Sequence, residues 1–158
     1  LPLMIKDIAS AFKAAQLLVD AAKADALTDA EKKDEDEISK LKEAWGATGS
    51  KMASGGSKVF KELEKEQKSR TTRATRDCLD MALLDIATAY RDIITLQLNS
   101  ESELINEDLR AELTALAQST KPESMLKRWD AVMATRRTLN FNVAPLLAIE
   151  ALLLNVKF

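Results

Sequence analysis

Apolar residues recur every three or four positions along most of the chain, which is the spacing of one face of an α-helix. Near the N-terminus this pattern predicts an amphipathic helix over residues 3–26, with a stripe formed by Ile5, Ile8, Phe12, Ala15 and Val19. Thr28 and Glu31 have the spacing of a capping box, so a second helix either starts at Asp29 or continues the first. Residues 29–45 then form an exposed helix, because they carry only a narrow apolar stripe of Ile38, Leu41 and Trp45.

Residues 46–56, GATGSKMASGG, contain all four glycines of the chain and predict a flexible linker. Residues 57–98 contain no glycine or proline and predict a second long helix, either straight or bent near residues 69–72. The apolar face of this helix lies in its second half and comprises Leu79, Leu83, Ile86, Tyr90, Ile93 and Ile94. The charged segments on both sides of the linker, residues 29–65, therefore predict an antiparallel helical hairpin that projects from a core made by later segments.

Shorter elements are predicted in the last third of the chain. A polar connection over residues 99–106 leads into a helix over residues 103–118, marked by Leu109, Leu113 and Leu116. Pro122 and Glu123 suit the first turn of a helix that extends to Leu139 and buries Met125, Leu126, Trp129, Val132 and Met133. A final helix covers residues 143–156, with Pro145 in its first turn. Together these patterns predict an all-α helical bundle.

The amino-acid composition limits the kinds of binding site and catalysis that the chain can provide. The 158 residues carry a net charge of −2 with both signs interspersed, so a basic excess that would favour nucleic acid as the main partner is lacking. The sequence has no histidine and one cysteine, Cys78, which excludes an internal disulfide and histidine-based catalysis and argues against zinc. We therefore predict no catalytic residue, no cofactor and no metal site. The chain enters a helical pattern directly from Leu1, so we expect a fragment without a signal peptide, and its apolar runs are too short to span a membrane.

Two charged or glycine-containing segments have both a functional and a structural interpretation. Gly49-Ser50-Lys51 and Gly56-Ser57-Lys58 have neither the spacing nor the strand context of a phosphate-binding loop, so a linker is the better interpretation. Basic residues of the second long helix align at spacings of three and four, which could serve DNA or an acidic partner: Lys58, Lys61, Lys65, Lys68, Arg70, Arg73 and Arg76. Interleaved glutamates favour a solvated face instead, and the acidic run over residues 34–37 could pair with it across the hairpin.

The last helix is apolar on nearly all sides, which is typical of a buried helix. Its residue Glu150 is surrounded at helical spacing by Leu146, Leu147, Leu153 and Leu154, while Ile149, Leu152 and Val156 supply a further apolar side. Such a helix is either the centre of a monomeric bundle or contacts another subunit on one side, and both can hold. A buried carboxylate needs a partner, so we expect an ion pair between Glu150 and Arg136 or Arg137.

Two segments carry a resemblance to a known family. The first resembles the closing motif of bacterial clamp-loader collar domains: Arg136-x-x-Leu139-x-x-Asn142-Val143-x-Pro145-x-Leu147-Ala148-x-Glu150-x-Leu152-Leu153-Leu154. The second, residues 66–98, is similar to the preceding collar helix of the delta-prime subunits of DNA polymerase III: EQKSRTTRATRDCLDMALLDIATAYRDIITLQL. Residues 120–123 and 1–26 also match the family pattern, whereas residues 29–65 are the least shared part.

The resemblance implies a division into a first collar helix (1–28), a charged hairpin with its glycine linker (29–65) and the main collar helices (66–158). It also implies a non-catalytic cytoplasmic module in a ring of five collar domains, beside tau/gamma and delta subunits. N-terminal AAA+ modules of the parent DNA polymerase III holoenzyme, a nucleotidyltransferase, would engage ATP, clamp and DNA. The candidate structural and interface residues are Arg136, Arg137, Asn142, Pro145, Leu147, Glu150, Leu153 and Leu154.

Three other interpretations remain open at this level. One is the collar domain of a tau/gamma subunit, which shares the closing motif. Another is a generic helical scaffold or adaptor that has the same packing pattern. The last is a small helical enzyme or ligand-binding bundle, which the lack of histidine, metal ligands and a phosphate loop disfavours.

Overall fold

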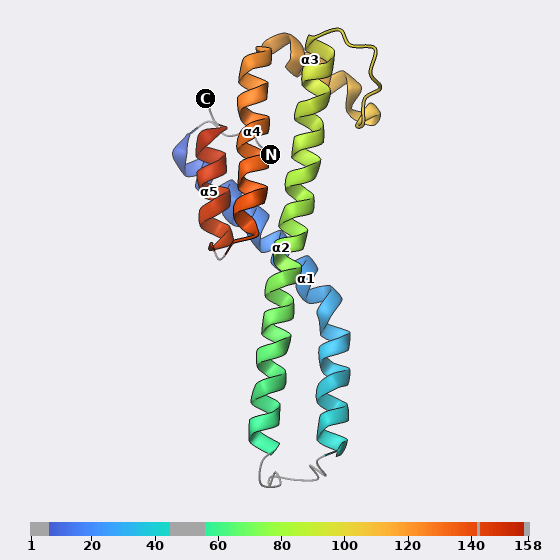
Figure 1. Ribbon diagram of the computed structural model, residues 1–158, viewed down its shortest axis with the longest axis vertical. Coiled ribbons are helices and arrows are strands. Elements are labelled where there is room, and N and C mark those ends of the chain that lie inside the picture. Colours follow the sequence, from blue (N-terminus) through green and yellow to red (C-terminus); the bar gives the residue numbers. More distant parts are fainter. Residues whose placement is uncertain (1–6, 45–55, 142, 157–158) are drawn as a thin grey trace. The chain divides into compact units, whose positions relative to one another are not determined.

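The structure is a computed structural model that describes residues 7–44, 56–141 and 143–156. Regular structure within these ranges is helical throughout, which confirms the predicted all-α class (Figure 1). The elements are α1 (Ile8–Ala44), α2 (Gly56–Gln97), the 3-10 turn η2 (Glu107–Leu109), α3 (Arg110–Ser119), α4 (Pro122–Leu139) and α5 (Pro145–Asn155). The predicted glycine linker lies outside the described residues except for Gly56, which begins α2.

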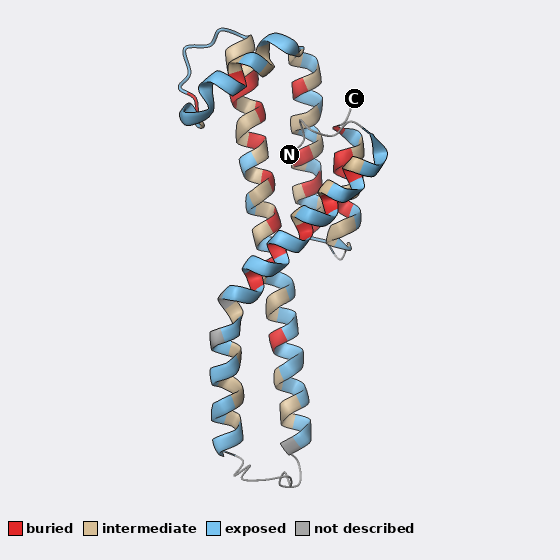
Figure 2. Cartoon of the chain, turned by 180° about the vertical axis from the view of Figure 1, so that it is seen from behind, coloured by how far each residue is buried: buried red, intermediate tan, exposed pale blue. Residues whose placement is uncertain are grey.

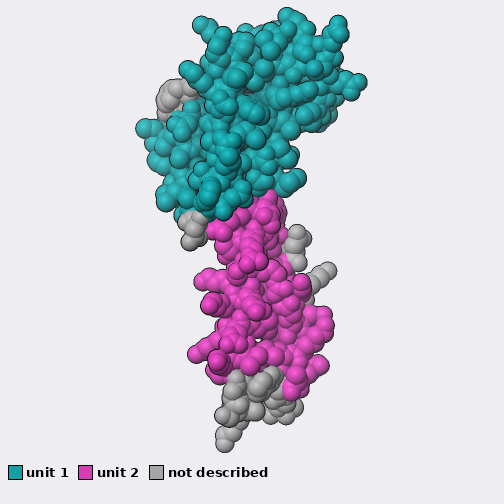
Figure 3. All heavy atoms as spheres, in the orientation of Figure 1, with its two compact units in different colours: residues 1–19, 79–158 teal, residues 20–78 magenta. Residues whose placement is uncertain are grey.

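The chain forms two compact units, which are coloured separately in Figure 3. Unit 1 comprises Leu1–Val19 and Leu79–Phe158, and unit 2 comprises Asp20–Cys78. Both long helices therefore contribute to both units: the start of α1 and the end of α2 belong to unit 1, and their remaining parts belong to unit 2.

The capping box predicted at Thr28 is wrong, because α1 continues through this position. The Thr28 hydroxyl donates to the Ala24 carbonyl oxygen at 3.0 Å, which is the bond of a threonine inside a helix. A reciprocal cap does occur at the true start of the helix. The Ser10 N–H donates to Asp7 Oδ1 at 2.6 Å, and the Asp7 N–H donates to Ser10 Oγ at 3.0 Å.

The start of α1 packs through small residues rather than through its largest ones. Ala11, Ala15 and Val19 are buried, so the predicted positions 15 and 19 are confirmed. Ile8 and Phe12, which belong to the same predicted apolar stripe, are 57% and 42% exposed, so only part of the stripe lies in the core. Alanines allow a helix to approach its neighbours closely, which leaves the bulkier side chains at the edge of the contact.

The core of unit 1 is mainly aliphatic, and its residues come from α1, α2, α3, α4 and α5. Figure 2 colours the buried positions red along the ribbon. The predicted α2 face is largely confirmed, with Leu79, Leu83, Tyr90 and Ile93 buried, and Ile86 and Ile94 half-buried. In α4 the predicted burial is confirmed for Met125 and Val132, whereas Trp129 and Met133 are only half-buried. The prediction for Leu126, which is 48% exposed, is wrong. Each fully buried aliphatic side chain contributes about 1.5–3 kcal/mol relative to exposure.

The connection after α2 is fixed by backbone and side-chain hydrogen bonds. Asn99, with φ of 50°, adopts the left-handed conformation that ends many helices, and the Ser100 N–H donates to the Thr95 carbonyl oxygen at 3.1 Å. The helix predicted over residues 103–118 begins later, at η2 and α3. Ile105 and Asn106 precede the helix, and their backbone N–H groups donate to the Asp92 carboxylate at 3.1 and 2.7 Å.

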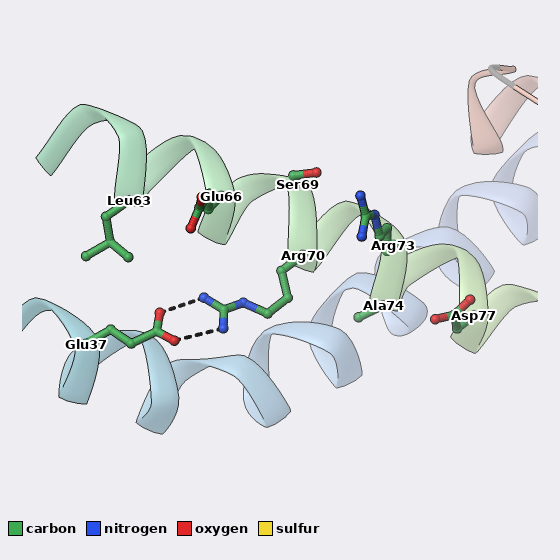
Figure 4. Close-up of a pocket in the computed structure, with 8 residues that line it drawn as sticks. All are labelled: Glu37, Leu63, Glu66, Ser69, Arg70, Arg73, Ala74 and Asp77. Carbon is green, nitrogen blue, oxygen red and sulfur yellow. Dashed lines mark hydrogen bonds and ion pairs between the residues drawn. The ribbon is translucent and has the colours of Figure 1, made fainter. Parts of the chain in front are cut away.

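In unit 2 the acidic run of α1 pairs with the basic part of α2, as the sequence suggested. Arg70 Nη1 and Nη2 donate to the two carboxylate oxygens of Glu37 at 2.9 and 2.6 Å (Figure 4). The same guanidinium lies 3.3 Å from the Asp34 carboxylate, and Gln67 Nε2 donates to the Asp34 carbonyl oxygen at 3.1 Å. These contacts join the two helices of the hairpin at a defined register.

We expect the Glu37 carboxyl to titrate far below its ordinary range. The hydrogen bonds from Arg70 lower its pKa from 4.5 to about 2, against an opposing effect of desolvation. Because the pKa is depressed in the folded state, the stabilisation is fully present above pH 4.5 and is lost as the pH falls toward 2. A side-chain NMR titration checks this midpoint. In the Arg70→Gln variant the midpoint should rise toward 4.5, and an unchanged midpoint would show that Arg70 is not its cause.

Candidate functional site

Helix α5 has one face that is buried in the core and an opposite, outer face that is exposed or half-buried. Both faces consist mainly of apolar residues. Ala148, Ile149, Leu152 and Leu153 are buried, and Val156, just after the helix, is buried as well. The opposite side, at spacings of three and four, comprises Leu147, Glu150, Ala151 and Leu154; we call it the outer face of α5. Leu147 is 62% exposed and Ala151 is exposed, while Glu150 and Leu154 are half-buried.

The residues at the start of α5 determine where the helix begins. Pro145 occupies the first turn, where its missing N–H leaves no bond unmade, and Ala144 before it is extended with φ −64° and ψ 122°. The end of α4 lies beside α5 (Figure 1), and the exposed Phe141 follows α4 and its C-cap residue Asn140. Phe141 is 69% exposed, so two large apolar side chains, Phe141 and Leu147, are presented to solvent around this turn.

The expected ion pair between Glu150 and an arginine of α4 is wrong. Arg136 Nε and Nη2 donate to the two carboxylate oxygens of Asp80 in α2, each at 2.8 Å. These bonds lower the pKa of Asp80 and raise that of Arg136, despite partial burial of both groups. Among the described residues, the Glu150 side chain has no ion pair or hydrogen bond, so its carboxylate is available to a group outside them.

The remaining candidate residues are buried, are partly or fully exposed, or lie outside the described part of the chain. Leu153 belongs to the core, which separates it from the leucine patch predicted around Glu150. Leu146 and Pro145 are half-buried, and Arg137 is exposed in the last turn of α4. Asn142 lies outside the described residues.

Two residues of this region were missed at the sequence level. Asp80 lies 56 positions before Arg136, and no local spacing connects the two. Phe141 lies between α4 and α5, and its apolar side chain gave no sign in the sequence that it is 69% exposed.

The Arg136–Asp80 pair should couple α2 to α4 by about 1–2 kcal/mol, the range for a charge-assisted bidentate pair with partial solvent screening. A double-mutant cycle with Asp80→Asn and Arg136→Gln, followed by urea unfolding, measures this coupling. Arg137→Gln, at the exposed neighbouring position, is the matched control and should change stability little. A coupling energy near zero would show that the two groups are close without stabilising the bundle.

Other kinds of site are not seen in the described part of the chain. Its His, Cys, Asp and Glu residues form no group of three or more that could hold a metal ion. None of its helices combines the length and apolar character needed to cross a bilayer. Cys78 is a free, half-buried thiol in α2.

Comparison with known proteins gives the family. A family model described as DNA polymerase III, delta subunit, C terminal, matches residues 74–157, just over half of the chain. The matched range contains the Asp80–Arg136 pair and the whole of η2, α3, α4 and α5. Neither curated proteins nor solved structures gave a match. The chain therefore belongs to the family of C-terminal domains of the DNA polymerase III delta subunit, a component of the clamp loader.

Proposed function

We propose that this chain is the C-terminal collar domain of a delta-prime subunit, a non-catalytic cytoplasmic module. It binds the tau/gamma and delta subunits and so helps to load the sliding clamp during DNA replication. Membership of the clamp-loader family supports the general assignment. The resemblance of residues 66–98 to the delta-prime collar helix supports the finer one.

The outer face of α5 is the single observation that carries the proposal. Leu147 is 62% exposed, although it lies on a helix whose other side is in the core. Removing such a side chain from water on assembly is favourable by about 1.5–3 kcal/mol. Glu150, without an ion pair in the described residues, adds a charge that a basic side chain of a neighbour can neutralise. An apolar centre with a charge at its edge is the usual composition of a subunit interface.

The basic part of α2 is not assigned to DNA. Arg70 is held by Glu37 and Asp34, and Glu62, Glu64 and Glu66 lie among the lysines of the same helix. Acidic side chains of the hairpin therefore offset part of the positive charge of this segment.

A second candidate is the C-terminal domain of the delta subunit itself, because the description of the matched family names that subunit. Native mass spectrometry of the chain mixed at micromolar concentration with full-length tau/gamma and delta separates the two. A delta-prime domain should appear in one complex with both partners. A delta domain should instead compete with full-length delta for its place. If the folded chain joins neither subunit and competes with neither, the proposal is wrong.

A further inference from the structure

A second apolar surface of unit 1 lies between α2 and the η2–α3 segment. It is a groove of about 420 Å³, a volume within the range of ligand-binding clefts. Ile86, Ala89 and Ile93 line it from α2, and Leu109, Leu113 and Leu116 line it from the facing segment. Ile93 and Leu113 are buried and form its floor, whereas Leu109 is 43% exposed at its edge.

The charged residues that line the groove are both acidic. Asp85 of α2 and Glu112 of α3 are exposed and stand on its two opposite walls. Lysine and arginine are missing from its described lining, and the nearby Arg110 is engaged by Glu107 at 2.6 and 2.8 Å. The groove thus combines an apolar floor with a negatively charged rim, which favours a positively charged occupant.

We propose that this groove binds an amphipathic helix of a neighbouring subunit, with an apolar ridge flanked by lysine or arginine. Two facing helices with an apolar floor form the usual receptor for such a helix. Identifying the owner of that helix as a clamp-loader subunit rests on the proposed function. A member of a ring with unlike contacts needs two different surfaces for its two neighbours. The outer face of α5 supplies one of them, and the groove supplies the other from different elements.

The test uses three synthetic helical peptides of about 18 residues that share one leucine ridge and differ in their flanks, which are lysine, glutamine or glutamate. Isothermal titration calorimetry with the 158-residue chain measures each Kd. The lysine-flanked peptide should bind at least about tenfold more tightly than the glutamate-flanked peptide, and high salt should reduce the difference. The double variant Asp85→Lys, Glu112→Lys should reverse the preference.

Two single variants locate the binding. Leu109→Glu should weaken the lysine-flanked peptide at least about tenfold, because it places a charge on the apolar edge. Leu98→Glu is the matched control, since Leu98 is 64% exposed and lies outside the groove lining. Circular dichroism verifies that both variants are folded. Equal binding of all three peptides, no binding of any, or equal loss from both variants would overturn the proposal. The peptides involve no clamp-loader subunit, so their failure leaves the test by mass spectrometry intact, and the reverse also holds.

Discussion

Replacing Leu147 by aspartate is expected to leave the chain folded and to abolish its assembly with other clamp-loader subunits. The side chain is 62% exposed, so an aspartate there stays hydrated in the free domain and should change the free energy of unfolding by less than about 0.5 kcal/mol. In an interface the same charge loses its water at an otherwise apolar position, and it stands one helical turn from the like-charged Glu150. We expect a loss of at least about 100-fold in affinity, or about 3 kcal/mol.

The matched variant is Ile149→Asp, two residues away on the same helix. Ile149 is completely buried, so an aspartate there should unfold unit 1. Thermal melting followed by native mass spectrometry with tau/gamma and delta separates the two effects. If Leu147→Asp melts and assembles like the unchanged chain, the outer face of α5 takes no part in assembly. If it unfolds the domain as Ile149→Asp does, the division of α5 into two faces is wrong.

The second large effect is expected at Asp92, which anchors the segment between α2 and η2. Its side chain is fully buried and accepts hydrogen bonds from the N–H groups of Ile105 and Asn106, from Asn106 Nδ2 and from Arg91 Nη1. Burial by itself would raise its pKa, but these four donors together hold the pKa below its ordinary value. The stabilisation is therefore present at neutral pH and is lost as the pH falls below 3.8.

Asp92→Asn replaces one acceptor oxygen with an amide group that faces donors. Leaving buried charge-assisted bonds unmade costs about 3 kcal/mol, which urea unfolding should detect. Amide hydrogen exchange should also speed up at Ile105 and Asn106, where the backbone donors are released. Asp108→Asn, at an exposed position of η2, is the control and should leave both measurements nearly unchanged. A loss below about 0.5 kcal/mol would show that the anchor is dispensable.

The sequence predicted the elements better than it predicted their contacts. Pro122 and Pro145 marked the first turns of α4 and α5 correctly, because proline has a local preference that packing does not override. The late start of α3 could not be predicted, since it depends on Asp92, a residue that is distant in sequence and that binds the amides of residues 105 and 106.

Two helices show why the burial of individual residues was harder to predict than the positions of the helices. In α5 nearly every position is apolar, so periodicity could not distinguish the buried Ile149 from the exposed Leu147. At the start of α1 the amphipathic pattern was correct in its period, but the small Ala11 is buried and the larger Phe12 is not. Hydrophobicity identifies an apolar side of a helix, whereas the distance between helices decides which residues of that side are covered.

Site-specific photo-crosslinking within the assembled complex tests the central claim most directly. A benzophenone side chain is placed at Leu147 on the outer face of α5, or at Leu27, a comparably exposed apolar position of unit 2 that is assigned to no interface. We predict that irradiation after mixing with tau/gamma and delta links position 147 to one of these subunits and gives no product from position 27. A complex that forms normally but gives no crosslink from position 147 would contradict the account.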